Sequence, residues 1–198
     1  VQALYEKKLA TYPRTDSQYL TEDMQATAAS LILWLRDNMP FGKGCTGEPD
    51  IDRVTDGSKV TDHHAIIPTV EIARTDLSEL PSGERDVLTL IAARLLCATA
   101  QAHRFEAVTA VLDCGGHSFT AKGKTVLQTG WKEVERLYRM ELKQSKAEEK
   151  ENEDTALPPL QEGQVFETVS ASVRDGKTSP PKHYTEVICY ERGIRNRP

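Results

Sequence analysis

The sequence predicts an α+β fold, in which a helical part comes first and a β-rich part follows. Apolar residues recur at helical spacing in two segments of the first half, one beginning at Thr21 and one at Ser82. The chain then changes to strand-forming residues followed by a Gly-Gly pair. We therefore expect a helical domain over 1–103 and a β-rich domain over 104–198.

The helices are expected from capping residues and apolar faces. Thr21 can cap the first helix, and the two acidic residues after it suit the positive end of the helix dipole. Its apolar face comprises Met24, Ala28, Leu31 and Leu35, and the helix stops near Pro40. Ser82 can cap the second helix, whose apolar face comprises Val87, Leu90, Ile91 and Leu95. Residues 3–9 look like a helix end, and 40–60 like a loop.

Three strands and a loop are expected in the second half. Residues 105–113 are rich in β-formers, and a two-residue turn at Gly115-Gly116 returns the chain as a strand at 117–122. Residues 164–174 form the third candidate strand. The charged run at 143–156 predicts a solvated, flexible loop.

Composition excludes several classes of protein. The 198 residues carry a net charge of −5, and residues 1–103 hold 10 Lys and Arg against 15 Asp and Glu. This balance argues against bulk electrostatic binding of DNA but permits a local phosphate site. No apolar run approaches the ~18 residues of a membrane span, so we expect no membrane partner. With no secretory signal and no Cys-x-x-Cys pair, we expect a cytoplasmic protein without a zinc site.

The first candidate site is Thr-Tyr-Pro-Arg-Thr-Asp-Ser at residues 11–17. Pro13 favours an extended backbone at Tyr12, which can hold the phenol outward. A phenol has a pKa near 10 and is a poor nucleophile at neutral pH, but the guanidinium of Arg14 can stabilise its developing charge or bind a phosphate. The pair suits attack on a phosphodiester. By spacing alone the signal is weak, and a tyrosine packed in a loop beside an exposed arginine is the favoured interpretation.

Two further stretches are candidates. In Thr-Asp-His-His-Ala-Ile-Ile-Pro-Thr at 61–69, neighbouring side chains diverge, so His63 and His64 suit a hydrogen bond to phosphate or general acid catalysis better than a shared metal. By spacing alone, surface or core histidines are the favoured interpretation. Thr-Ser-Pro-Pro-Lys-His-Tyr-Thr-Glu at 178–186 is made extended by its prolines, and by itself predicts only a linker or strand edge.

Taken together and in order, these stretches resemble the central part of a type IA DNA topoisomerase. The resemblance rests on Tyr-Pro-Arg-Thr-Asp-Ser at 12–17, Asp-His-His-Ala-Ile-Ile-Pro-Thr at 62–69 and Ser-Pro-Pro-Lys-His-Tyr-Thr-Glu at 179–186. The proline after the tyrosine and the His-His form are most similar to the bacterial topoisomerase III branch. With Gly130-Trp131, which also fits, the resemblance covers nearly the whole chain.

The resemblance implies a mechanism and residue roles. In this family a tyrosine attacks one DNA strand and becomes linked to the 5′-phosphate, the other strand passes through the gap, and the free 3′-hydroxyl reseals it without ATP. By motif, Tyr12 would be the nucleophile, and Arg14 would position the scissile phosphate and stabilise its charge. His63 would hydrogen-bond DNA phosphate near the site, and His64 occupies a variable position.

The resemblance also implies domains and partners. In the family, the tyrosine lies in a helical, winged-helix-like domain carried by a β-rich arch, in agreement with the boundary near 103. The acidic Mg²⁺ site belongs to a Toprim domain that is absent from these residues, so we expect Mg²⁺ there and the present residues alone to be inactive. Expected partners are a single-stranded DNA segment, the Toprim and remaining domains, and a helicase.

Two other hypotheses compete with the interpretation of the chain as part of an enzyme. One is a single-stranded DNA-binding module without cleavage, and the other is a fragment that keeps the fold without the function. The pair Tyr12 and Arg14 favours the enzyme over the fragment, because no structural role requires both. The carboxyl end departs from the family pattern, since residues 191–198 keep only a trace of its Gly-Ile-Gly-[Arg/Thr]-Pro motif.

Overall fold

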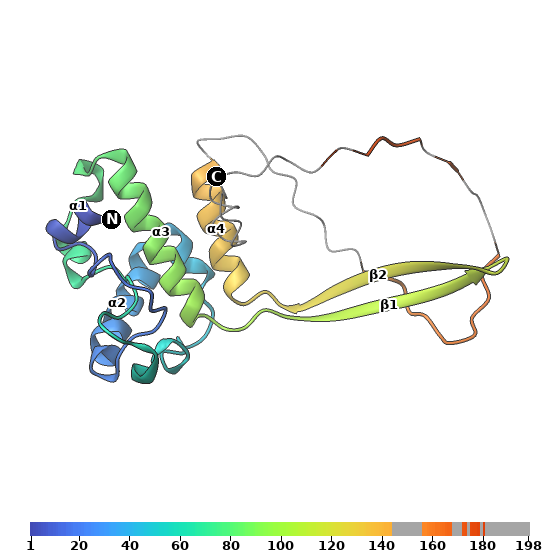
Figure 1. The fold of residues 1–198 in the computed structure, drawn as a ribbon, viewed down its shortest axis with the longest axis horizontal. Helices are drawn as coiled ribbons and strands as arrows, with labels where there is room; N and C mark the ends of the chain where they lie inside the picture. Colours follow the sequence, from blue (N-terminus) through green and yellow to red (C-terminus); the bar gives the residue numbers. More distant parts are fainter. Residues whose placement is uncertain (144–155, 168–171, 174, 179, 181–198) are drawn as a thin grey trace, which may run out of the picture. The chain divides into compact units, whose positions relative to one another are not determined.

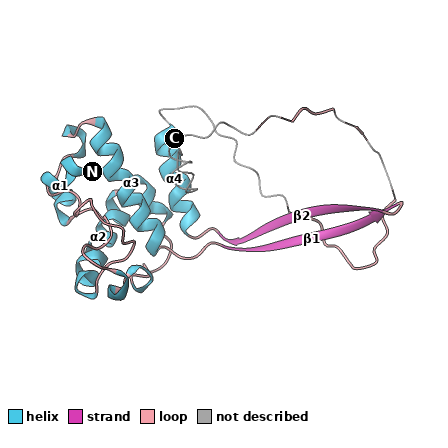
Figure 2. Cartoon of the chain, viewed as in Figure 1, coloured by secondary structure: helices cyan, strands magenta, loops and turns pink. Residues whose placement is uncertain are grey.

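The computed structural model describes residues 1–143, 156–167, 172–173, 175–178 and 180. The chain divides into two compact units, 1–160 and 161–198. In the described part of the first unit, helices are followed by a two-stranded antiparallel sheet and one more helix, so the predicted α+β class is confirmed (Figures 1 and 2).

The helical part is built from α1 (Gln2–Glu6), α2 (Gln25–Asn38) and α3 (Ser82–Thr99), joined by loops and short 3₁₀ turns. A 3₁₀ turn over Glu22–Met24 precedes α2, and Thr21 lies before it without forming a side-chain cap. The predicted end of this helix near Pro40 is confirmed, since α2 stops at Asn38.

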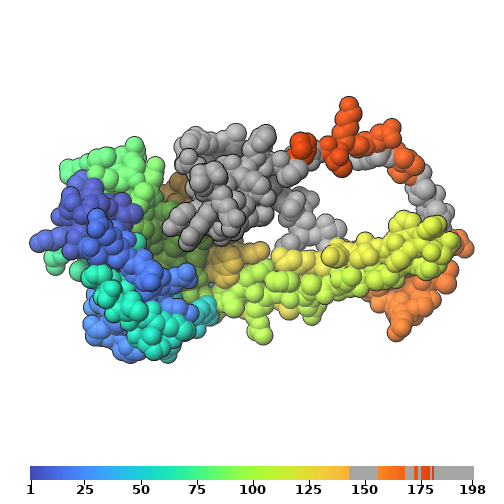
Figure 3. All heavy atoms as spheres, in the orientation of Figure 1, coloured from blue at the N-terminus to red at the C-terminus, as the bar shows by residue number. Residues whose placement is uncertain are grey.

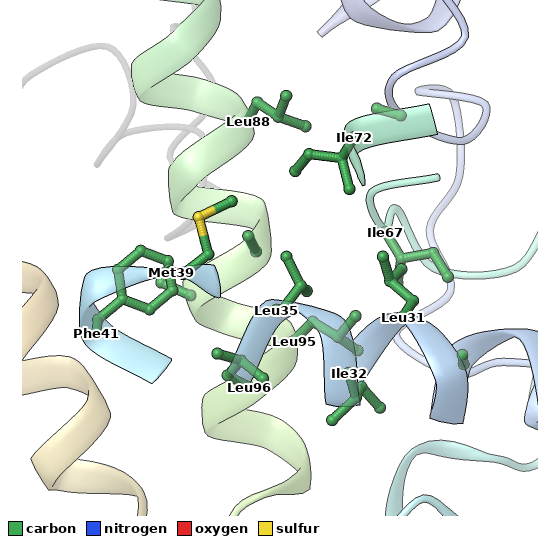
Figure 4. Close-up of a cluster of buried hydrophobic side chains, with 14 of the residues drawn as sticks. Leu31, Ile32, Leu35, Met39, Phe41, Ile67, Ile72, Leu88, Leu95 and Leu96 are labelled. Atoms are coloured by element: carbon green, nitrogen blue, oxygen red, sulfur yellow. The ribbon is translucent and has the colours of Figure 1, made fainter. Parts of the chain in front are cut away.

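A single core joins these helices (Figure 4). From α2 and the turn after it come Leu31, Ile32, Leu35, Met39 and Phe41, which meet the α3 side chains Leu88, Ala92, Leu95 and Leu96. The predicted apolar face of α3 is partly wrong, because Leu90 is 40% exposed while Leu88 is fully buried. Ile67 and Ile72 extend this core toward the segment that follows the histidines.

The strands β1 (Arg104–Cys114) and β2 (His117–Gln128) form the predicted hairpin. Gly115 and Gly116 both have positive φ, which the two-residue turn requires. Both strands are exposed along most of their length (Figure 3). The secondary structure therefore changes at Arg104, beside the boundary expected near residue 103, while the division into domains there stays a prediction.

The helix α4 (Trp131–Lys143) follows β2 and was not expected from the sequence. It packs on α3 and on the turn Pro40–Gly44, where Val134 is fully buried and the ring of Tyr138 meets that of Phe41 edge-on at 5.5 Å. Apolar residues at 131, 134, 137 and 138 have helical spacing, so the signal was present among many charged residues.

The remaining predictions fall on sparsely described residues. Among the described residues of the expected strand at 164–174, namely 164–167 and 172–173, none lies in a strand. The charged run lies outside the described residues except at its ends, as does the third motif except for Thr178 and Pro180.

Among the described helices, none has the length and apolar character needed to cross a membrane.

Gly130 lies where β2 joins α4 and has φ +54°. A Cβ there would meet the backbone carbonyls of Gln101 and Ala102. Gly130→Ala should therefore lower the free energy of unfolding by about 2–3 kcal/mol, measured by urea titration. The matched control is Gly83→Ala in α3, where a Cβ meets nothing within 4 Å and stability should be unchanged or slightly higher. Equal effects of the two substitutions would contradict this account.

Cys97 lies in α3 with its thiol facing the start of α4, and burial and then the Glu135 carboxylate raise the pKa of this thiol to about 11. At pH 8 only about one thiol in a thousand would be ionised, so iodoacetamide should label Cys97 far more slowly than exposed Cys114. Because the pKa is raised, labelling of Cys97 should gain about tenfold per pH unit up to about pH 10. Peptide mass spectrometry would measure both rates, and a plateau below pH 9 would contradict the prediction.

Candidate active site

A tight turn at the end of α1 directs the chain toward the first motif. Lys8 has φ +61°, the left-handed conformation, and its N–H donates to the Tyr5 carbonyl at 2.8 Å. The N–H of Leu9 donates to the carbonyl of Leu4 at 2.8 Å. These two bonds form a Schellman motif, and the buried side chains of Leu4 and Leu9 supply its apolar contact.

The first motif then pairs with the second. The N–H of Thr11 donates to the Ile67 carbonyl at 3.0 Å, and the N–H of Thr69 donates to the Leu9 carbonyl at 3.0 Å. The hydroxyl of Thr11 accepts from the N–H of Ile67 at 3.0 Å and donates to the Ala65 carbonyl at 3.3 Å. Two segments far apart in the sequence, with Thr11 and Ile67 separated by 56 positions, thus lie side by side.

A second threonine extends this connection. The hydroxyl of Thr15 donates to the His63 carbonyl at 2.6 Å and accepts from the N–H of Ser17 at 3.0 Å. The hydroxyl of Ser17 donates to the carbonyl of Lys59 at 3.0 Å. The loop that carries Tyr12 is therefore tied on both sides of the tyrosine, through Thr11 and Thr15.

These bonds bring the predicted site residues together. The ring of Tyr12 lies 4.3 Å from that of His63, centroid to centroid, and their planes are tilted by 48°. An open pocket of about 780 Å³ is lined by Tyr12, Arg14, Thr15, Asp16, Thr61, Asp62 and His63. His64 does not line this pocket, and its Nδ1 lies 2.8 Å from the Ala65 carbonyl oxygen.

The pocket has cationic and anionic groups. Arg14 is exposed and forms no ion pair or hydrogen bond with any other described residue, so its donors face solvent. A free guanidinium of this kind can grip a phosphate with two parallel hydrogen bonds. Asp16 and Asp62 also line the pocket and partly offset this charge.

Some residues at the site were not predicted from the sequence. Thr15 and Asp16 lie inside the first motif, and Thr61 and Asp62 begin the second, so the motifs themselves were the available signal. Tyr5, whose ring meets that of Tyr12, carried no signal. Among the described residues, no group of three or more His, Cys, Asp or Glu side chains is arranged to hold a metal ion.

The comparisons with known proteins agree on one family. A family model described as DNA topoisomerase matches residues 1–188. DNA topoisomerase 3 of Bacillus subtilis is 35% identical over 192 residues, which cover 94% of this chain and 25% of the relative. DNA topoisomerase 3 of Vibrio cholerae is 31% identical over 194 residues, which cover 96% of this chain and 28% of the relative.

The match covers nearly all of this chain but only part of each relative. The chain spans about a quarter of the length of these curated relatives. Both pocket-lining motifs lie within the residues that the family model matches. The expected resemblance is thereby confirmed, and the chain belongs to the DNA topoisomerase family.

Proposed function

We propose that the chain supplies the nucleophile of a type IA DNA topoisomerase, which cuts and reseals one DNA strand through a 5′-phosphotyrosine. One observation carries the proposal: Tyr12, Arg14 and His63 line the same open pocket although two motifs far apart in the sequence provide them. A phenol can act as the nucleophile in attack on a phosphodiester, and a free guanidinium and an imidazole can bind the phosphate and stabilise its charge.

The proposed step is a transesterification. The phenolic oxygen of Tyr12 forms a bond to phosphorus, and the bond from phosphorus to the 3′ oxygen breaks. The phenol loses its proton, and the departing oxygen gains one and becomes a free 3′-hydroxyl. Resealing reverses both changes, and because one ester replaces another, ATP is not consumed.

Arg14 and His63 would act on the phosphate. The exposed guanidinium of Arg14 would bind the non-bridging oxygens and stabilise the charge that builds up as the phenol attacks. The ring of His63, beside that of Tyr12, would donate a hydrogen bond to a DNA phosphate oxygen.

The rest of the enzyme would come from outside these residues. The helical part would be the winged-helix-like nucleophile domain, and the hairpin would belong to the arch. We propose that a Toprim domain carries the Mg²⁺ site, and no step above is routed through a metal. Single-stranded DNA would be the substrate and a helicase a further partner, in the cytoplasm at the nucleoid.

Tyr12→Phe tests the nucleophile directly. The chain, combined with the Toprim part that completes the enzyme, should form a covalent adduct with a labelled single-stranded oligonucleotide. The adduct should disappear in Tyr12→Phe, because no oxygen remains to attack phosphorus. Denaturing gel electrophoresis would measure it.

The chain alone is the matched control and should neither form the adduct nor relax supercoiled DNA. An adduct that persists in Tyr12→Phe would show that another residue is the nucleophile. Oligonucleotide binding without any adduct from the unsubstituted chain in the completed enzyme would favour the DNA-binding module instead.

His63→Ala tests the phosphate contact. Loss of a hydrogen bond to a charged group, about 1.5–3 kcal/mol, should slow adduct formation by about one to two orders of magnitude. The control is His64→Ala, which removes the adjacent imidazole that does not line the pocket and should leave the rate nearly unchanged.

Circular dichroism separates this role from a structural one. His63 is exposed, so His63→Ala should keep the helical spectrum of the unsubstituted chain. A collapsed spectrum would support a core histidine. Equal rates for the two alanine variants would remove the proposed role of His63.

A further inference from the structure

We propose that Tyr5 is a positioning residue, whose ring holds the phenol of Tyr12 in place for attack. The proposal rests on the proposed function, because it assigns Tyr5 a part in the transesterification by Tyr12. Tyr5 lies in α1, outside both motifs that line the pocket.

The ring of Tyr12 contacts two other rings. The Tyr5 ring meets it edge-on, with centroids 5.3 Å apart and planes at 78°. The His63 ring contacts it at 4.3 Å. Edge-to-face pairs at such distances are favourable beyond the area they bury.

Ring contacts are the interactions available to hold this phenol. Tyr12 makes no side-chain hydrogen bond with any other described residue, so its oxygen is free for a phosphate. Pro13 restricts the backbone of Tyr12 but not its side-chain torsions. Without the ring of Tyr5, the phenol would sample other rotamers over the open pocket. Its oxygen would then be less often in line with the phosphorus–oxygen bond that breaks.

The position of Tyr5 is itself well fixed. Its neighbour Leu4 is fully buried. The carbonyl of Tyr5 accepts one of the two hydrogen bonds of the Schellman motif, from the N–H of Lys8. That turn, with Lys8 left-handed, brings Tyr12 back beside Tyr5 only seven residues later. The hydroxyl of Tyr5 has no hydrogen-bond partner among the described residues, which assigns the role to the ring.

The test compares Tyr5→Leu with Tyr5→Phe in the chain completed by its Toprim part. Single-turnover adduct formation at saturating oligonucleotide should slow about two- to tenfold in Tyr5→Leu, the size expected for one aromatic pair. Tyr5→Phe keeps the ring and should retain the rate. The dissociation constant for the oligonucleotide should be unchanged in both variants. The control is Leu33→Ala in α2, a residue 41% exposed against 40% for Tyr5.

Three outcomes would overturn the proposal. The rate of adduct formation could be unchanged in Tyr5→Leu, or it could fall equally in Tyr5→Phe. The dissociation constant for the oligonucleotide could also rise enough to account for the slower rate. Should Tyr5→Leu fail to fold, Tyr5→Met gives the same comparison without a ring. Tyr12→Phe in the same assay tests the proposed function separately, so the two failures are distinguishable.

A readout on the chain alone needs no activity. With ¹³C-labelled tyrosine, Tyr12→Phe identifies the ring signals of Tyr12 in the NMR spectrum. These signals should shift and change in line width in Tyr5→Leu, because the ring current and the restraint of Tyr5 are lost, and should stay nearly in place in Tyr5→Phe. Unmoved signals in Tyr5→Leu would contradict the contact itself.

Discussion

The candidate site depends on the pairing of residues 9–17 with residues 59–69. Two backbone hydrogen bonds, from Thr11 to Ile67 and from Thr69 to Leu9, form this pairing. Each contributes only about 1 kcal/mol, so these bonds alone would not hold the two segments together. They persist because Leu9, Ala10, Ile67 and Pro68 are buried beside them. Burial of these side chains offsets the entropy of closing the long intervening loop. The core therefore fixes the pairing, and the pairing fixes the distance between Tyr12 and His63.

The charges around the pocket affect where a phosphate can bind. The helical part carries more acid than base, so attraction of DNA over its whole surface is weak. Under the proposed function, recognition of a DNA strand at the pocket would depend on geometry, through Arg14 with its free donors and the imidazole of His63. Asp16 and Asp62 disfavour a phosphate placed near them, which narrows the positions that a strand can take.

The sequence predicted the elements whose residues repeat regularly, and missed what depends on tertiary contacts. The hairpin followed from β-formers and a Gly-Gly turn, and α2 from its spacing. The side of α3 that is buried depends on what packs against it, and the helical spacing of apolar residues in α4 was obscured by the charged residues between them. Residue spacing alone did not place Tyr12 beside His63, for which the motif resemblance was needed. The contact with Tyr5 requires a left-handed lysine, a conformation that lysine rarely adopts, so no local propensity predicts it.

The same core connects the site to the hairpin. The chain leaves α3 for β1 and returns from β2 to α4 at adjacent points, where the N–H of Trp131 donates to the Gln101 carbonyl at 2.8 Å. Close approach at Gly130 makes this junction compact. Since α3 and α4 pack on each other and α3 also contacts α1 and α2, the root of the hairpin and the loop of Tyr12 share one packed body. Interiors packed in this way resist compression and transmit strain, so a displacement of the hairpin root would be transmitted to the loop that carries Tyr12.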